Sequence, residues 1–458
     1  MNLTGIKFIY MLGIGGIGMS ALARYFQIQG MNVFGYDKVR SDLCKELESE
    51  GFKIRYKSDV VDMLDIIKDI VPDQLLIIYT PAISSSNLEL DFLKKNNYNI
   101  YKRAEVLGEI SKKCFTIAIA GTHGKTTTTA ILAHILKELG VPIIAFLGGI
   151  SKNYNTNLLY DKNSDFFIVE ADEYDRSFLN LHPNIVIITS IDIDHLDTYK
   201  NKTNLENTFI QFVSQIKEKG LAIVEESIAV SFSSINHINL LRYSTSKKAD
   251  FYASNIHIEN SKYCFDFTCN NKTRQPIECV LPGEHNISNI VAAIAVSCCL
   301  KLDINKVAES IINFLGIKRR FEILINKKQL TYIDDYAHHP KEVTSTIETV
   351  KELFPKRYIT VVFQPHLFSR TQYLAVEFAK SLSLADHLIL LDIYAAREKS
   401  ITRINSSMLL DLCTNSKKET CTKNNLLPVL NKKKIDVLLT LGAGDIGNLT
   451  EPIKHMLN

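Results

Sequence analysis

Residues 121–127, Gly-Thr-His-Gly-Lys-Thr-Thr, combine glycines, a lysine and hydroxyls in the spacing of a phosphate-binding loop. They follow the apolar run Phe115–Ala120 and precede a helical pattern. Backbone N–H groups of such a loop point at an anion, and the helix dipole favours negative charge there. Lys125 can reach a terminal phosphate and the Thr126 hydroxyl can ligate Mg²⁺. The motif predicts transfer or hydrolysis of the γ-phosphate of ATP, and its short Gly-x-x-Gly-Lys-Thr spacing indicates a subset of P-loop enzymes.

Acidic residues follow the next apolar strand, and a histidine follows the one after it. Glu170, Asp172 and Glu173 end the run that begins at Phe166, and His195 comes after a second strand. Because the carboxyl ends of parallel strands meet at one sheet edge, these groups can hold Mg²⁺ beside the phosphate loop. We favour this interpretation over a solvated acidic turn, most strongly for Glu170. His195 is either a further ligand of a two-metal site or a loop histidine.

A second glycine turn lies near the N-terminus. Residues 13–18 read Gly-Ile-Gly-Gly-Ile-Gly, and Asp37 stands at the end of the next predicted strand. In dinucleotide-binding proteins such glycines let a pyrophosphate approach the backbone and the acid binds a ribose. The pattern alone fits NAD and a UDP-sugar equally well, because both carry a diphosphate.

Further polar clusters occur where other predicted strands end or helices begin. Gly283–Asn289 opens a helix, in which an asparagine can cap the helix or bind an adenine edge. Lys318–Glu322 is a charge cluster that is either surface or the source of an arginine for the γ-phosphate. Asp334–Pro340 and Gln364–Thr371 each stand between a strand and a helix, where the crevice rule predicts a binding edge. Arg370 suits a substrate carboxylate through bidentate contact.

The alternation of strands, glycine turns and helices predicts an α/β protein with parallel sheets. Three segments each open on their own strand, which predicts an N-terminal domain over 1–105, a central P-loop domain over 106–318 and a C-terminal domain over 319–458. The stretch around Phe251–Val280 is rich in strand formers. The basic stretch Lys417–Lys434 is interpreted as a solvated face.

Composition excludes several classes of protein. The chain has 458 residues with 53 Lys and Arg against 50 Asp and Glu, too balanced to indicate nucleic acid or a membrane surface as partner. Nine cysteines without a Cys-x-x-Cys pair indicate reduced thiols and a cytoplasmic location. Neither a signal peptide nor a membrane span is recognisable.

The ordered motifs resemble those of the ATP-dependent Mur ligases of peptidoglycan synthesis. The resemblance spans nearly the whole chain, because it includes the N-terminal Gly-Ile-Gly-Gly-Ile-Gly-Met-Ser and Gly-Thr-His-Gly-Lys-Thr-Thr-Thr, Glu-Ala-Asp-Glu, Asp-His-Leu-Asp, Gly-Glu-His-Asn-Ile-Ser-Asn, Lys-Arg-Arg-Phe, Asp-Asp-Tyr-Ala-His-His-Pro and Gln-Pro-His-x-x-Ser-Arg-Thr. It implies a Rossmann-like UDP-binding domain, a P-loop ATPase domain and a Rossmann-like C-terminal domain that brings the amino acid.

The resemblance also implies roles for individual residues. The ATP site comprises Gly121, Thr122, His123, Gly124, Lys125, Thr126 and Thr127, with Asn289 near the adenine and Arg320 near the phosphates. Mg²⁺ is held by Thr126, Glu170 and His195, and Lys125, Glu170, His195 and Arg320 form the catalytic set. The UDP-linked substrate meets Gly15, Gly16, Ile17, Gly18 and Asp37, while Tyr336, His338 and Arg370 form the edge for the amino acid and the sugar acid.

The implied reaction is ligation of L-alanine to the lactyl carboxylate of UDP-N-acetylmuramate through an acyl phosphate. The nearest alternative is a recycling ligase that joins a tripeptide to the same acid. Two other classes are an NAD-dependent oxidoreductase, which leaves the P-loop without a role, and a nucleotide-gated binding module, against which the intact phosphate and metal positions argue. A monomer–dimer equilibrium is expected.

Overall fold

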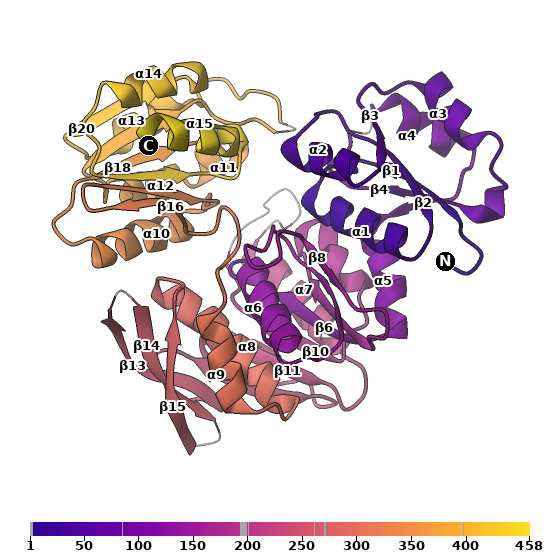
Figure 1. Ribbon diagram of the computed structural model, residues 1–458, viewed down its shortest axis with the longest axis horizontal. Helices are drawn as coiled ribbons and strands as arrows, with labels where there is room; N and C mark the ends of the chain where they lie inside the picture. The colour runs from indigo at the N-terminus through magenta and orange to yellow at the C-terminus, as the bar shows by residue number, and fades with distance from the viewer. Residues whose placement is uncertain are drawn as a thin grey trace. The chain divides into compact units, whose positions relative to one another are not determined.

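The computed structural model describes residues 3–84, 86–192, 199, 201–260, 262–269, 272–396 and 398–458. Contacts divide the chain into two units. The first comprises Met1–Ile256, Phe265–Glu278 and Ser288–Phe314, and the second comprises His257–Cys264, Cys279–Ile287 and Leu315–Asn458. Within the described part of the chain the strands form three sheets, which can be followed by colour in Figure 1.

The first sheet has the strand order β3-β2-β1-β4-β5, and its four pairings are all parallel. Its strands are β1 (Phe8–Leu12), β2 (Asn32–Tyr36), β3 (Lys53–Arg55), β4 (Leu75–Tyr79) and β5 (Ile100–Lys102). The helices that follow these strands are α1 (Ile17–Ile28), α2 (Asp42–Ser49), α3 (Val60–Ile67), α4 (Leu88–Lys95) and α5 (Arg103–Lys113). Residues on both faces of β1 are buried, as expected for a central parallel strand covered by helices.

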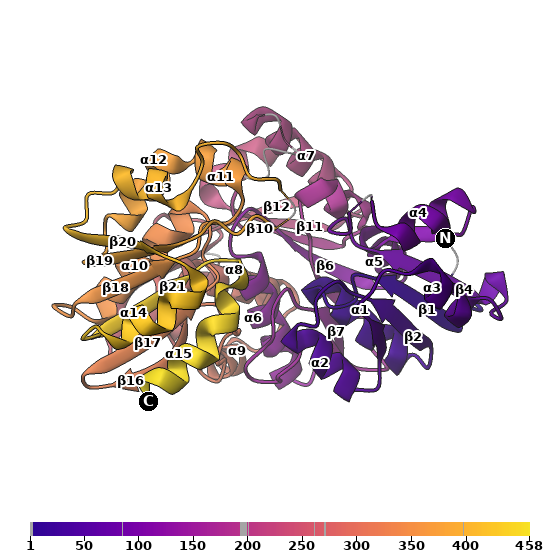
Figure 2. The ribbon, with the colours of Figure 1, turned by 90° about the horizontal axis from the view of Figure 1, so that it is seen from above.

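The second sheet has the order β15-β14-β13-β12-β11-β10-β6-β9-β7-β8. Seven of its strands are β6 (Phe115–Ala120), β7 (Ile143–Phe146), β8 (Leu158–Tyr160), β9 (Phe166–Glu170), β10 (Ile185–Ile188), β11 (Leu221–Glu225) and β12 (Asn239–Ser244), with β8 at one edge. The strand-rich stretch predicted from the sequence forms β13 (Phe251–Glu259), β14 (Lys262–Cys269) and β15 (Lys272–Cys279). Helices α6 (Lys125–Glu138), α7 (Lys202–Ser214), α8 (Glu284–Cys299) and α9 (Ile304–Ile312) accompany these strands (Figure 2).

The third sheet has the order β16-β17-β21-β18-β19-β20 and belongs to the second unit. Its strands are β16 (Glu322–Lys327), β17 (Leu330–Asp335), β18 (Ile359–Phe363), β19 (His387–Leu391), β20 (Lys417–Cys421) and β21 (Val437–Leu441). The pairing of β16 with β17 is antiparallel, and the other four pairings of this sheet are parallel. Its helices are α10 (Pro340–Leu353), α11 (Phe368–Tyr373), α12 (Ala375–Leu382), α13 (Ser406–Leu412), α14 (Leu426–Asn431) and α15 (Thr450–Leu457).

The basic stretch Lys417–Lys434 is more than the solvated face that the sequence suggested. Its first residues form the edge strand β20, and Leu426 and Leu430 in α14 are buried in a core cluster. The strand and the helix were not recognised among the many lysines, because an edge strand and a short helix each bury only a few apolar residues.

None of the helices in the described ranges has the length and apolar character needed to cross a membrane. The fold class predicted from the sequence, an α/β protein with parallel sheets, is confirmed.

Candidate active site

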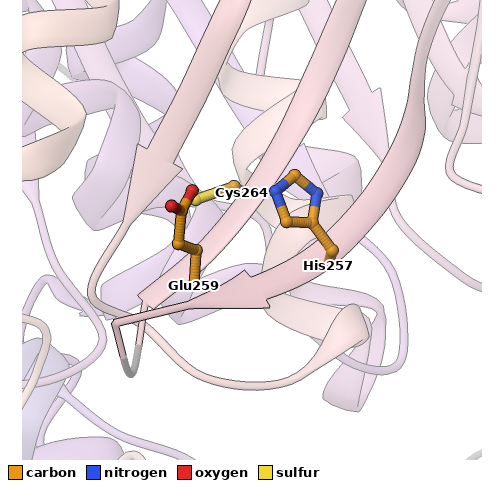
Figure 3. A group of neighbouring side chains, drawn as sticks. All are labelled: His257, Glu259 and Cys264. Atoms are coloured by element: carbon orange, nitrogen blue, oxygen red, sulfur yellow. The ribbon is translucent and has the colours of Figure 1, made fainter.

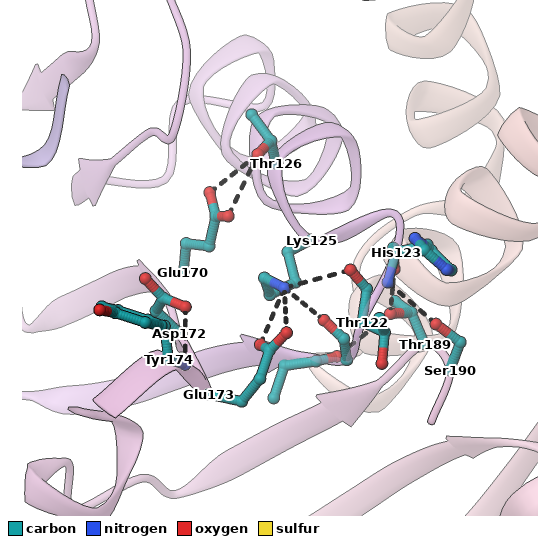
Figure 4. Close-up of polar contacts among 12 residues, drawn as sticks. Thr122, His123, Lys125, Thr126, Glu170, Asp172, Glu173, Tyr174, Thr189 and Ser190 are labelled. Carbon is teal, nitrogen blue, oxygen red and sulfur yellow. Dashed lines mark hydrogen bonds and ion pairs between the residues drawn. The ribbon is translucent and has the colours of Figure 1, made fainter. Parts of the chain in front are cut away.

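The phosphate loop joins β6 to α6, as the sequence predicted. Gly121 and Gly124 have φ values of 131° and 80°, a region that favours glycine, and Lys125 is the first residue of the helix. Strands β9 and β10 flank β6 in parallel, so their carboxyl ends meet the loop at one edge of the sheet. The residues that follow these strands therefore surround Lys125 and Thr126 (Figure 4).

Lys125 is held by a carboxylate that belongs to the loop after β9. Its Nζ lies 2.8 Å from Oε2 and 3.1 Å from Oε1 of Glu173, and 2.5 Å from the carbonyl oxygen of Gly121. Burial acts to lower the pKa of Lys125, but Glu173, Asp172 and Glu170 together raise it above the usual lysine value. The lysine is therefore fully charged and fixed beneath the loop.

The Thr126 hydroxyl and the Glu170 carboxylate form the second contact of this edge. Thr126 Oγ1 donates to Glu170 at 3.0 Å and 3.1 Å from its two carboxylate oxygens, and the Thr126 side chain is buried. Hard oxygen donors of this kind suit Mg²⁺, which is commonly held by a P-loop hydroxyl and a nearby carboxylate. The residues present thus fit the predicted metal.

Residues after β10 hold the loop from its other side. The Ser190 hydroxyl accepts from the His123 backbone N–H at 3.0 Å, and Thr189 Oγ1 donates to the His123 carbonyl oxygen at 2.5 Å. The Asp192 backbone N–H donates to Thr122 Oγ1 at 2.9 Å, and the Asp192 carboxylate lies 3.4 Å from His123 Nε2. His123 is therefore anchored by the next strand of the sheet. Thr127, the next residue of α6, is half-buried.

Two further predicted residues are Asn289, near the adenine, and His195, a metal ligand. The structure describes only the first of them. Asn289, within α8, accepts a hydrogen bond at 3.1 Å from Thr128 in the P-loop helix, so the adenine candidate lies against α6 and does not cap its own helix. His195 lies outside the described residues, and its role as a metal ligand stays a prediction.

The N-terminal glycine turn is shaped by the acid that the sequence associated with it. Asp37 Oδ2 accepts from the backbone N–H of Gly15 at 2.9 Å, and Gly13 donates to the carbonyl oxygen of Tyr36 at 2.7 Å. Gly16 then caps α1 in an extended conformation. The Asp37 carboxylate therefore supports the turn itself, a contact that the ribose interpretation did not anticipate.

We call the sheet edge at Thr126 and Glu170 the metal edge. Within the first unit, a cavity of about 110 Å³ joins the glycine turn to this metal edge. Among the residues that line it are Ile17 and Gly18 from the start of α1 and Glu170 from the end of β9. Arg103, the first residue of α5, also lines it, and its guanidinium is so close that a Cβ on Gly18 would collide with it. Arg103 was not among the predicted site residues, although its position directly after strand β5 obeys the same crevice rule.

The first unit is fixed around this cavity by polar contacts. Asn157 donates to the carbonyl oxygen of Ile17 at 2.6 Å and accepts from Arg24, which also pairs with Glu50 at 2.6 Å. Lys102 pairs with Asp175 at 2.7 Å. The glycine turn and the metal edge are therefore held in place by contacts between residues distant in sequence.

In the second unit, two arginines lie over one tyrosine. The guanidinium carbons of Arg319 and Arg320 are 5.3 Å and 4.9 Å from the centre of the Tyr336 ring. Arg319 also pairs with the fully buried Asp334 at 2.9 Å and donates to the carbonyl oxygen of Gly442. Arg319 therefore stabilises the fold, whereas Arg320 is the residue predicted to lie near the phosphates.

The remaining predicted substrate residues converge around His366. The His338 ring lies edge-on to Tyr336 at 5.5 Å and 6.0 Å from His366, counted between ring centres. The buried Arg370 donates to Nδ1 of His366 at 3.2 Å, and Tyr394 stacks on that ring with 5.7 Å between ring centres. The structure therefore brings Tyr336, His338 and Arg370 to one site, and it adds His366 and Tyr394, which sequence analysis did not select.

A buried carboxyl group directly precedes Tyr336 in the sequence. Asp335, at the end of β17, accepts from the Ala337 backbone N–H and from Thr346 Oγ1, each at 3.0 Å. Burial raises the pKa of Asp335 to about 6, although Arg320 and the hydrogen bonds oppose that rise. Asp335 therefore changes charge in a pH range where most carboxylates stay ionised.

Three family models cover most of the chain. The Mur ligase family catalytic domain matches residues 8–114, the Mur ligase middle domain matches 119–297, and the Mur ligase glutamate ligase domain matches 319–444. The chain belongs to the Mur ligase family.

Individual relatives match the chain over nearly its full length. The UDP-N-acetylmuramate–L-alanine ligase of Christiangramia forsetii is 43% identical over 456 residues, covering 100% of this chain and 99% of its own. The crystal structure of UDP-N-acetylmuramate–alanine ligase from Thermotoga maritima has a TM-score of 0.81 at 29% identity, covering 98% of this chain and 99% of its own. The murein peptide ligase of Psychrobacter arcticus has a TM-score of 0.74 at 22% identity over 98% of each chain, which shows a shared fold.

Proposed function

We propose that this chain ligates L-alanine to the lactyl carboxylate of UDP-N-acetylmuramate, consuming ATP and giving UDP-N-acetylmuramoyl-L-alanine, ADP and phosphate. The observation that carries the proposal is the cavity shared by Gly18 of the glycine turn and Glu170 of the metal edge, because it joins a diphosphate-binding device to an ATP-phosphate site. Full-length relatives that bear the name of this ligase support the choice of substrates.

The chemistry explains why both sites are needed. A carboxylate is a poor electrophile, since its charge repels an incoming amine. A lactyl carboxylate oxygen attacks the γ-phosphorus of ATP, ADP leaves, and an acyl phosphate forms. The amine nitrogen of L-alanine then attacks the acyl carbon, the tetrahedral intermediate collapses, and phosphate leaves as the amine proton is lost.

The residues of the first unit act on the phosphoryl transfer. The loop from Gly121 to Thr127 binds the phosphates, and Lys125 neutralises charge on the transferring group. Thr126 and Glu170, with His195 as a predicted third ligand, hold Mg²⁺, which supplies further neutralisation of the phosphate charge when bound. Asn289 contacts the adenine, and Gly15–Gly18 with the Asp37-supported turn binds the uridine diphosphate.

The residues of the second unit act on the amino acid and on the transferred charge. Arg370 binds the carboxylate of L-alanine, since a guanidinium contacts a carboxylate in bidentate fashion. Tyr336 and His338 line the same edge, and Arg320 contributes positive charge toward the phosphates. We further propose that the enzyme works in the cytoplasm, where thiols stay reduced, and that it exchanges between monomer and dimer.

The deciding experiment measures phosphate release from ATP with UDP-N-acetylmuramate and either free L-alanine or an L-Ala-D-Glu-diamino-acid tripeptide. Release that requires L-alanine, with a product of the mass of UDP-N-acetylmuramoyl-L-alanine, supports the proposal. Release only with the tripeptide replaces it with the recycling reaction, and release with neither acceptor contradicts both. Size-exclusion chromatography with light scattering at two protein concentrations tests the expected equilibrium between monomer and dimer.

A further inference from the structure

Three side chains with metal-binding atoms converge on the hairpin formed by β13 and β14. They are His257, Glu259 and Cys264, and their ligand atoms all lie within 4.8 Å of one another. Cys264 lies between the other two (Figure 3). The ligase chemistry proposed above uses none of the three, and all belong to one continuous segment, His257–Cys264, of the second unit.

The local structure explains why the three side chains meet. His257 and Glu259 are two residues apart on β13, so they project from the same face of that strand. Only two residues separate the end of β13 from the start of β14, which carries Cys264. A hydrogen bond of 2.5 Å from Asn255 to Asp266 crosses the same hairpin on the side away from its turn. This contact fixes the alignment of the two strands next to the cluster.

The ligand set indicates which metal it can take. An imidazole nitrogen, a carboxylate oxygen and a thiolate sulfur are the ligands of protein zinc sites, whereas Mg²⁺ and Ca²⁺ prefer oxygen alone. Zinc holds these atoms at about 2.0–2.3 Å, which places neighbouring ligand atoms roughly 3.5 Å apart in a tetrahedron. His257 and Glu259 are exposed, so rotation of their side chains can bring their ligand atoms to that spacing around the buried Cys264.

We propose that His257, Glu259 and Cys264 form a zinc site, with water as the fourth ligand. The ion links β13 to β14 and stabilises the hairpin against opening. The site differs in chemistry from the metal edge, because it offers a thiolate, whereas Thr126 and Glu170 offer oxygen atoms. Zinc and Mg²⁺ therefore select different places in the same chain.

Titration of the full-length chain with Co²⁺ and with Zn²⁺ tests the site. The protein is stripped with a chelator, kept reduced, and titrated in excess Mg²⁺, which competes for the site at Thr126 and Glu170. Cobalt in the wild-type protein is expected to give a thiolate-to-cobalt charge-transfer band in the near ultraviolet. Zinc is expected to abolish this band by displacement at one equivalent per chain, as counted by elemental analysis.

Variants of the ligands separate this site from other thiols and histidines. Cys264→Ser is expected to lose the charge-transfer band. His257→Ala and Glu259→Gln replace exposed side chains, so they retain the fold even if Cys264→Ser does not. His257→Ala is expected to weaken zinc binding by at least about tenfold, since loss of even an outer-shell partner costs roughly 10–100-fold.

Two matched controls accompany these variants. Cys269→Ser removes another buried thiol from β14, and His237→Ala removes another exposed imidazole. Both are expected to bind both metals as the wild type does. Equal zinc affinity in the wild type and His257→Ala would overturn the proposal, as would a charge-transfer band that persists in folded Cys264→Ser.

Discussion

Lys125 Nζ lies 2.8 Å from Glu173 Oε2, and both side chains are largely withdrawn from water, with 12% and 2% of their areas exposed. The P-loop lysine is therefore oriented by a carboxylate that follows the neighbouring strand. Such a contact has two consequences, one for catalysis and one for stability, because a buried charge that loses its partner is costly.

Lys125→Ala is expected to reduce the rate of phosphate release at least 100-fold, since removal of one group that stabilises transition-state charge commonly costs about 10²–10³ in kcat. It is also expected to lower the free energy of unfolding by about 3–5 kcal/mol, because Glu173 stays buried without its partner. Chemical denaturation and a coupled ADP assay measure the two effects, and circular dichroism checks that the fold is retained.

The double variant Lys125→Ala, Glu173→Gln separates these two effects. It is expected to recover part of the lost stability, because glutamine carries no charge, yet to recover no activity. Normal ligase rates in a folded Lys125→Ala protein would refute the phosphate-loop assignment.

Gly148→Ala is expected to raise the Mg²⁺ concentration needed for half-maximal activity about tenfold or more, a loss of roughly 1.4 kcal/mol in metal binding. A Cβ at this position would collide with the Glu170 carboxylate, and it would also crowd the Thr126 hydroxyl. The carboxylate end of Glu170 can move aside, so the melting temperature should change little. Kinetics over a Mg²⁺ series measure the effect, and an unchanged Mg²⁺ requirement would show that Glu170 does not bind the metal.

The raised pKa of Asp335 makes the free energy of unfolding depend on pH. Its folded pKa of about 6 lies above the ordinary value of 3.8, so between these values the folded state binds more protons than the unfolded state. The contribution of Asp335 to the free energy of unfolding is fully present below pH 3.8 and is lost as the pH rises to 6, a change on the order of 3 kcal/mol.

Asp335→Asn tests this, since the amide can accept from the Ala337 N–H and donate to Thr346 Oγ1. The free energy of unfolding of the variant is expected not to show this decline with rising pH. Chemical denaturation at pH 4, 5, 6 and 7 measures that free energy. The exposed Asp411→Asn serves as control and should retain the wild-type profile. An identical decline in Asp335→Asn and the wild type would contradict the prediction.

Arg370→Lys is expected to raise KM for L-alanine about 10–100-fold, because a hydrogen bond to a charged group contributes about 1.5–3 kcal/mol and lysine lacks the bidentate geometry. KM for ATP should stay close to the wild-type value. Initial rates at varied L-alanine measure the change, with the exposed Arg403→Lys as control. A wild-type KM for L-alanine in Arg370→Lys would remove Arg370 from the amino-acid site.

Much of the fold followed from local pattern. The apolar run Phe115–Ala120, predicted as the strand before the phosphate loop, forms β6 with the same bounds, since short apolar runs bounded by turn residues mark buried parallel strands. Helix α1 begins at Ile17, inside the glycine turn predicted over residues 13–18, because the backbone of Gly16 caps it without a side-chain signal. The Mur ligase family and the substrates of its relatives were likewise recognised from the ordered motifs and are confirmed by the comparisons.

The sequence by itself determined the strands, the glycine turns and the types of the chemical groups at their ends, because these depend on neighbours close along the chain. Only the tertiary structure decided that Glu173 pairs with Lys125, that Asp37 supports Gly15, and that Arg103 meets Gly18. These contacts join residues from separate strands and helices. Such pairings depend on strand order and on side-chain packing between distant segments, which local sequence patterns do not encode.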